Sequence, residues 1–192
     1  MEKGTIIAVT GSIGAGKSTL LIGLAATLKG MGIATAGLIS ARLSRHGERS
    51  GYELLNLTCG NVEPLATLTP PEPGTEHLFL PLCHLFFYRQ ALHAGNDAIR
   101  DGLGADCLIV DEIGHWELSG GGWADHLHLL QERKGPTILG MRIGIAQDLE
   151  RLYGIRLAHT VRLNLSGKET AMKELLEFVT LGRKLPSGAS EA

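Results

Sequence analysis

Eight residues near the start of the chain, Gly11-Ser-Ile-Gly-Ala-Gly-Lys-Ser18, have the types and the spacing of a phosphate-binding loop. They match G-x-x-x-x-G-K-[ST], in which backbone N–H groups surround the phosphates of a nucleotide. Glycines such as Gly11 and Gly16 let the backbone curl around an anion with no Cβ in the way. In this pattern Lys17 places its charge on the β- and γ-phosphates, and the Ser18 hydroxyl is a ligand for Mg²⁺. The stretch therefore predicts nucleotide binding.

The segments on either side of this loop support the prediction. Thr5–Thr10 is a short, apolar and partly β-branched run, as expected of a buried strand. Thr19–Lys29 repeats leucine on one helical face, and Gly30 supplies a stop. A helix here points its positive end at a bound anion. We expect the nucleotide to contact Gly11, Ser12, Ile13, Gly14, Ala15, Gly16, Lys17, Ser18 and Thr19.

Two neighbouring acids follow a second apolar run. Ala105–Glu112 contains four apolar residues and ends in Asp-Glu, which is typical of a Walker B strand. The carboxyl ends of the strands are where open α/β sheets bind ligands, so this strand delivers its carboxylates to the nucleotide. We expect Asp111 to hold Mg²⁺, directly or through water, and Glu112 to orient and deprotonate the attacking water. An apolar run ending in two acids is common by itself, and the phosphate loop makes it informative.

Phosphoryl transfer also needs positive charge on the γ-phosphate beyond Lys17 and Mg²⁺, and arginine is the usual source. Arg142 follows the predicted strand Thr137–Met141 and is our candidate for a catalytic arginine, with a surface salt bridge as the alternative. Arg45 and Arg49 flank a turn, and a solvated hairpin tip is the simpler interpretation of both.

The rest of the chain predicts a mainly parallel α/β sheet with a small antiparallel extension. Gly32–Ser40, with a continuation to Leu43 as the alternative, is predicted as a strand that pairs with Arg49–Leu57. Gly51 indicates a bulge or a close backbone approach there. Leu78–Phe87 is apolar, is broken by Pro81 and has no assignment. Gly114–Trp123 is predicted as a flexible segment whose tryptophans pack on the core. Further strands are predicted at Asn61–Thr67 and His159–Asn164, and helices at Tyr88–Asp101, Ala124–Lys134, Ile145–Tyr153 and from Ser166.

Length and composition favour one globular domain. The 192 residues fit a single domain over 1–181, and 182–192 are predicted as a flexible tail. A net charge of −2 lacks the basic character that general nucleic-acid binding requires. No apolar run approaches the roughly 20 residues that span a bilayer. Three widely spaced cysteines and the lack of room for a signal peptide predict a cytoplasmic protein. No pattern indicates a protein partner.

With these motifs in view, the chain resembles the cancer-related nucleoside triphosphatase family of small P-loop enzymes. Gly11–Thr19 matches at the loop. Gly37–Ser40 with Gly47–Leu54 is similar to the family's hairpin and its G-x-R-x-G-[FY] signature. Val110-Asp-Glu-Ile-Gly114, followed by Glu117-Leu-Ser119, is similar to the V-D-E-I-G-x-x-E-L stretch, the most specific part. The resemblance covers roughly residues 4 to 165.

The resemblance implies a three-layer, RecA-like P-loop fold that hydrolyses ATP, GTP and other nucleoside triphosphates slowly and with broad base tolerance. By motif match, Gly11–Ser18 binds the nucleotide, Asp111 binds the metal and Glu112 is catalytic. Two features depart from the family pattern. His115-Trp116 stands where many members have Pro followed by Leu or Met, and either Arg42 or Arg45 matches the arginine ahead of the hairpin turn.

Three classes of function share the phosphate loop. The first is a Mg²⁺-dependent hydrolase, which Glu112 directly after the Walker B aspartate favours. The second is a small-molecule or nucleotide kinase, but Arg151 and Arg156 lie too far inside regular elements for an arginine-bearing lid. The third is a nucleotide-switched accessory protein that resembles the GTP-binding partner of molybdopterin-guanine dinucleotide synthesis.

Overall fold

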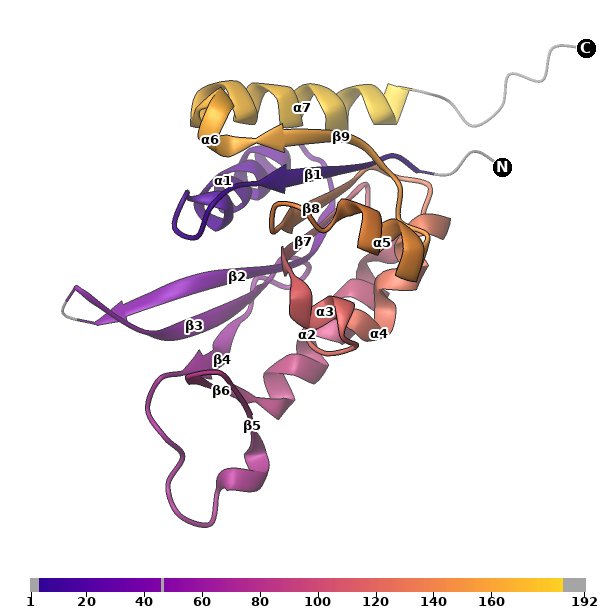
Figure 1. The fold of residues 1–192 in the computed structure, drawn as a ribbon. Coiled ribbons are helices and arrows are strands. Elements are labelled where there is room, and N and C mark those ends of the chain that lie inside the picture. Colours follow the sequence, from indigo (N-terminus) through magenta and orange to yellow (C-terminus); the bar gives the residue numbers. More distant parts are fainter. Residues whose placement is uncertain (1–3, 46, 185–192) are drawn as a thin grey trace, which may run out of the picture.

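The computed structural model describes residues 4–45 and 47–184, which form one nine-stranded sheet with helices on both faces (Figure 1). The strand order is β5-β6-β4-β3-β2-β7-β8-β1-β9. The strands are β1 Ile6–Thr10, β2 Thr35–Arg45, β3 Glu48–Asn56, β4 Val62–Thr67, β5 Phe79–Leu82, β6 Leu85–Tyr88, β7 Cys107–Ile113, β8 Thr137–Met141 and β9 Leu157–Arg162. The helices are α1 Lys17–Gly30, α2 Arg89–Asp101, α3 His115–Leu118, α4 Ala124–Leu127, α5 Ala146–Tyr153, α6 Leu163–Ser166 and α7 Lys168–Lys184.

The half of the sheet from β2 to β9 is parallel, with β8 between β1 and β7. Every residue of β1 and of β8 is buried. Strands that are covered on both faces need continuous apolar sequence, which is what their apolar runs predicted. The strand before the phosphate loop and the strand that carries the two acids therefore end at the same edge, with the end of β8 between them.

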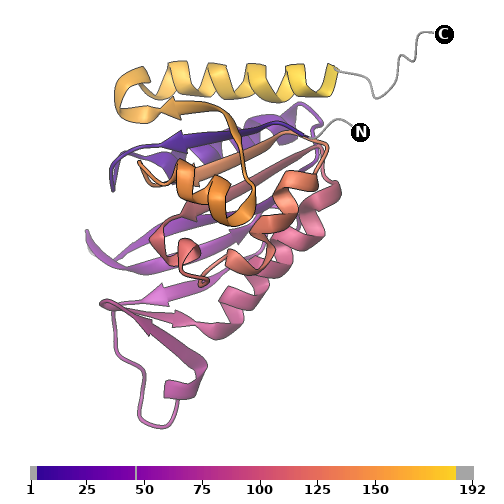
Figure 2. The same ribbon diagram turned by 45° about the vertical axis from the view of Figure 1, so that its right-hand side comes forward.

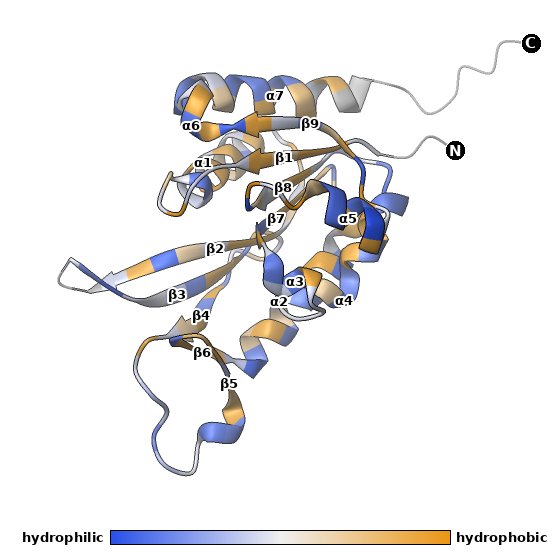
Figure 3. Ribbon diagram, in the orientation of Figure 1, coloured by the Kyte–Doolittle hydropathy of each residue, from blue (hydrophilic) through white to orange (hydrophobic). Residues whose placement is uncertain are grey.

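Helices cover the two faces in separate groups (Figures 1 and 2). Leucines of α1 and buried residues of α7 pack on one face, and α2, α4 and α5 pack on the other. Figure 3 shows hydrophobic residues along the central strands and hydrophilic residues on much of α5 and α7. The expected three-layer α/β architecture of a P-loop NTPase is confirmed.

The antiparallel extension is also confirmed, and it is larger than expected. Strands β2 and β3 form the predicted hairpin, and β4, β6 and β5 continue the sheet with antiparallel pairing. A Cβ on Gly51 would lie 2.1 Å from the carbonyl oxygen of Ala66, so the close backbone approach predicted there is present. The unassigned stretch Leu78–Phe87 contains β5 and most of β6, which turn at Cys83 with a φ of 55°.

Several predicted elements differ from the structure in type or in length. The helix predicted at Ala124–Lys134 is α4 followed by a 3₁₀ segment, His128–Glu132. The buried pair Leu127 and Leu130 is three residues apart, a spacing that suits a 3₁₀ turn. Strand β9 begins two residues earlier than predicted and gives way to α6 at Leu163. Helix α7 includes residues 182–184, which were predicted as part of the tail, and 185–192 lie outside the described residues.

The segment Gly114–Trp123 contains a short helix and is not an extended flexible loop. Trp123 is 3% exposed and fills the space that a Cβ on Gly95 would occupy. The rings of Trp116 and Phe87 lie 4.7 Å apart between centroids. Both tryptophans therefore pack against the protein, as the sequence favoured. None of the described helices is long and apolar enough to cross a bilayer.

Candidate functional site

The phosphate loop connects β1 to α1 and curls around its own lysine. Gly14 and Gly16 have φ angles of 81° and 91°, which glycine adopts without the steric cost of a Cβ. Lys17 opens α1, two residues earlier than predicted, and is 8% exposed. Its Nζ donates to the carbonyl oxygens of Gly11 and Ser12 at 3.3 and 3.5 Å. These hydrogen bonds are long and therefore weak, so the ammonium would bond more strongly to a phosphate that enters the loop.

Asp111 lies at the carboxyl end of β7 and is fully buried. Neither of its carboxylate oxygens accepts a hydrogen bond of good geometry from any described residue. A Cβ on Gly140 would lie 2.0 Å from Asp111 Oδ1, so only glycine fits opposite the carboxyl group on β8. Buried polar atoms are normally paired, and unpaired carboxylate oxygens are ligands that Mg²⁺ prefers. The residues present therefore fit a divalent cation.

The environment of Asp111 opposes its charge. Burial, and to a smaller extent the neighbouring charge of Glu112, raise the pKa of its carboxyl group to about 7. The Ser18 hydroxyl, the backbone N–H of Glu112 and the Lys17 ammonium lower this pKa, but they offset burial only in part. A cation beside the carboxylate favours the ionised form, so cation binding and deprotonation of Asp111 are linked.

Glu112 has a backbone conformation that is rare for its residue type. Val110 pairs with Leu139 and Ile113 pairs with Met141, so Asp111 and Glu112 together oppose the single residue Gly140. This is a bulge, and Glu112 takes a φ of 62° in it. A non-glycine residue in this region costs on the order of 1–3 kcal/mol and is found mainly where the surrounding structure enforces it. The bulge buries Asp111 while its neighbour Glu112 stays partly exposed.

Arg142 lies beside this bulge. Its backbone N–H donates to the carbonyl oxygen of Ile113 at 2.9 Å. Its Cδ and Nε lie 3.4 Å from the position that a Cβ on Gly114 would take. No ion pair found within residues 4–45 and 47–184 includes Arg142, so the surface salt bridge considered from the sequence is not observed. The structure therefore brings Arg142 to the segment that carries Asp111 and Glu112.

The other candidate arginines lie in the antiparallel extension. Arg49 donates to the hydroxyl of Tyr52 at 3.5 Å, stacks its guanidinium over that ring at 5.9 Å and contacts His84. Arg42 is on β2, where it pairs with Tyr52 of β3, and Arg45 is the last residue of β2. Arg49 is thus engaged within the extension.

Two residues that the sequence did not single out border the phosphate loop. Asn164 follows β9, and its Nδ2 donates to the Oγ of Ser12 at 3.1 Å. The Cε of Lys168 lies 2.9 Å from the position that a Cβ on Gly16 would take. Their place after a strand that neighbours β1 is the signal that could have identified them, because adjacent parallel strands end at one edge.

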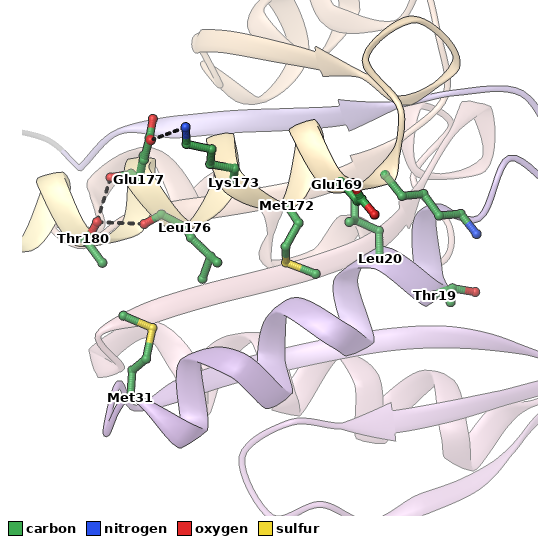
Figure 4. A pocket seen from close by; sticks show the side chains of 10 residues that line it. Thr19, Leu20, Met31, Glu169, Met172, Lys173, Leu176, Glu177 and Thr180 are labelled. Carbon is green, nitrogen blue, oxygen red and sulfur yellow. Dashed lines mark hydrogen bonds and ion pairs between the residues drawn. The ribbon is translucent and has the colours of Figure 1, made fainter.

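A groove of about 690 Å³ between α1 and α7 is a separate feature (Figure 4). It approaches the phosphate loop only at Thr19 and Lys168. The side chains of Leu20, Met172 and Leu176 give it an apolar lining. Lys17, Asp111 and Glu112 do not line it, so the groove is separate from the candidate site.

Comparisons with known proteins agree with this geometry. The model of a protein family described as NTPase matches residues 6–175. The nucleoside-triphosphatase THEP1 of Methanosarcina barkeri is 27% identical over 135 residues, which are 69% of this chain and 73% of that protein. The enzyme of the same name from Methanocaldococcus jannaschii is 23% identical over 93% of this chain and 99% of its own length.

Solved structures show the same fold. A human cancer-related nucleoside triphosphatase matches with a TM-score of 0.69 and 18% identity, over 94% of this chain and all of that one. THEP1 from the hyperthermophile Aquifex aeolicus matches with a TM-score of 0.64 and 16% identity, over 91% and 99% of the two chains. The match extends from the start of β1 into α7 and includes all nine described strands. The chain therefore belongs to the NTPase family.

Proposed function

We propose that the protein is a Mg²⁺-dependent hydrolase that converts ATP, GTP and other nucleoside triphosphates to the diphosphate and phosphate, slowly and with broad base tolerance. The observation that carries this proposal is the buried Asp111 carboxyl group, whose oxygens accept no hydrogen bond of good geometry from the described residues and which lies near Ser18 of the phosphate loop. Several similar proteins are named nucleoside-triphosphatase, which supports the same reaction.

In this proposal the phosphate loop from Gly11 to Thr19 binds the triphosphate, and Lys17 neutralises its β- and γ-phosphates. Ser18 and Asp111 would hold Mg²⁺, which would supply charge neutralisation of the phosphate oxygens. Glu112 accepts a proton from the water that attacks the γ-phosphorus, the bond to the β-phosphate oxygen breaks, and the diphosphate leaves.

Arg142 contributes positive charge to the γ-phosphate in the transition state. The arginines considered for a kinase lid are engaged elsewhere. Arg151 pairs with Asp148 at 2.9 Å, and Arg156 pairs with Glu150 at 2.7 Å, both on exposed surface around α5. This arrangement supports hydrolysis over transfer to a second substrate.

Phosphate release from several nucleoside triphosphates, measured with the wild type, Lys17→Ala and Glu112→Gln, tests the proposal. Glu112→Gln is expected to keep nucleotide affinity and to lose turnover, whereas Lys17→Ala loses affinity as well. Turnover of Glu112→Gln at the wild-type rate, or phosphate transfer only to an added acceptor, would overturn the proposal. Negligible wild-type turnover until a partner protein is added identifies a switch instead.

A further inference from the structure

Glu117 is a buried carboxyl group that the proposed mechanism does not use. It lies in α3, directly after the Walker B segment, and it is 3% exposed. Buried carboxyl groups are costly to keep and are retained where their oxygens are bonded. The partners of this side chain therefore indicate its role.

The Glu117 carboxyl group is wedged between two turns. Its Oε2 accepts a hydrogen bond from the backbone N–H of Gly114 at 2.7 Å. Its Oε1 lies 2.0 Å from the position that a Cβ on Gly122 would take, and Gly122 has a φ of 56°. The hydroxyl of Tyr153 in α5 donates to the Glu117 backbone carbonyl oxygen at 2.5 Å. The Glu117 side chain thus lies between the main chain at Gly114 and at Gly122.

The peptide bond between Ile113 and Gly114 is held at both ends. Glu117 accepts from its N–H, and the backbone N–H of Arg142 donates to its carbonyl oxygen at 2.9 Å. The plane of this peptide is therefore fixed, one residue after Glu112. Glu112 could relax from its φ of 62° if the following chain were free to rotate, so the fixed plane maintains the bulge.

We propose that Glu117 is a positioning residue: its carboxylate locks the Ile113–Gly114 peptide and thereby holds Glu112 in the backbone conformation needed for proton abstraction. The proposal rests on the proposed function, because it assigns Glu117 an effect only through Glu112. Displacement of a reacting group by about 1 Å can cost roughly 100-fold in rate. Glu117 thus acts on turnover and not on nucleotide affinity.

Turnover, nucleotide affinity and thermal stability of four variants test this role. Glu117→Ala removes the acceptor and is expected to lower kcat by roughly 100-fold. Glu117→Gln keeps one acceptor oxygen for the Gly114 N–H and is expected to lose about tenfold, because a neutral acceptor replaces a charged one. Both keep the affinity for Mg²⁺ with a non-hydrolysable triphosphate analogue within about threefold, since neither touches the phosphate loop.

Tyr153→Phe is the matched control, because it removes a hydrogen bond to the backbone of α3 and leaves the Ile113–Gly114 peptide held. We expect it to lower the melting temperature slightly and to keep the wild-type kcat. The double variant Glu112→Gln/Glu117→Ala is expected to be no slower than Glu112→Gln alone, because the two residues act as one unit.

Four results overturn the proposal: wild-type kcat for Glu117→Gln, a loss of kcat as large in Tyr153→Phe as in Glu117→Ala, a parallel loss of affinity, or an additive double variant. If Glu117→Ala does not fold, Glu117→Gln decides the question. Wild-type turnover by Glu112→Gln identifies a different failure, that of the proposed function itself.

Discussion

Two buried ionisable side chains lie at opposite edges of the parallel sheet, and they differ in their hydrogen bonds. Arg133 lies at the amino-terminal edge, just before β8, and is 5% exposed. Its Nη1 donates to the carbonyl oxygen of Pro136 at 2.8 Å, and its Nη2 donates to that of Ala105. Asp111 lies at the carboxyl edge with neither oxygen bonded to a described residue.

The contrast separates a structural charge from the charge that we propose to be functional. Burial lowers the pKa of Arg133, but its bonds to main-chain carbonyls tie together the segments that precede β7 and β8. Burial raises the pKa of Asp111 to about 7, and no comparable bonds compensate. A site that binds a ligand keeps such a group at a cost in stability. The two side chains should therefore respond in opposite ways to substitution.

Asp111→Asn is expected to have the largest effect. We expect Mg²⁺-dependent turnover to fall by roughly 1,000-fold, because the neutral amide is a poor ligand for Mg²⁺. The same substitution removes a buried charge, so the ligand-free protein should melt at a higher temperature at pH 8. A variant that is both less stable and fully active contradicts the comparison.

The pH dependence of stability gives a second test of the contrast between Asp111 and Arg133. The folded pKa of Asp111, about 7, exceeds its ordinary value of 3.8, so the folded protein binds more protons than the unfolded chain between these values. The free energy of unfolding therefore falls as pH rises through this range, by about 4 kcal/mol from this group. Glu117, whose pKa burial raises to about 7, adds a fall of the same sign. Urea unfolding at pH 5 and pH 8 measures the slope, which should be shallower in Asp111→Asn.

Arg133→Met tests the structural charge. It removes the side-chain donor to the carbonyl oxygen of Ala105 and one of the two donors to that of Pro136, which also accepts from the backbone N–H of Leu108. This loss is expected to lower the free energy of unfolding by about 2 kcal/mol. Turnover per folded molecule should not change, because the residue lies at the opposite edge from the nucleotide. Arg156→Gln, which breaks an exposed pair, is the control and should cost less than about 0.5 kcal/mol. Lost turnover in folded Arg133→Met contradicts this division of roles.

Arg142→Ala is expected to have the smallest effect. We expect kcat to fall about tenfold with nucleotide affinity nearly unchanged, because the charge acts in the transition state. Arg142→Lys should recover part of the rate. Equal rates in all three proteins, measured at saturating nucleotide, exclude Arg142 from the chemistry.

Local signals predicted the parts of this molecule that depend on a few adjacent residues. The phosphate loop and the buried strands β1, β7 and β8 are specified by glycine spacing and by continuous apolar runs. The hairpin of β5 and β6 was not assigned, because Pro81 interrupts it and its left-handed turn residue is Cys83 instead of glycine.

Within the candidate site, too, local motifs predicted some residues, and others depend on tertiary contacts. Lys17, Asp111 and Glu112 were proposed from motifs, whereas Gly140 and Asn164 matter only through tertiary neighbours on adjacent strands. Glu117 was visible as part of a matched sequence stretch, but its bond to Gly114 required the structure. The positive-φ residue of the bulge is Glu112 and not a glycine, so the sequence did not predict the bulge.

The carboxyl pKa of Asp111, followed by ¹³C NMR with and without Mg²⁺ and a non-hydrolysable triphosphate analogue, tests the central claim most directly. The account predicts a pKa of about 7 in the free protein and a fall below the ordinary value of 3.8 in the complex. An Asp111 that titrates at its ordinary value in the free protein, or whose pKa the complex leaves unchanged, would contradict it.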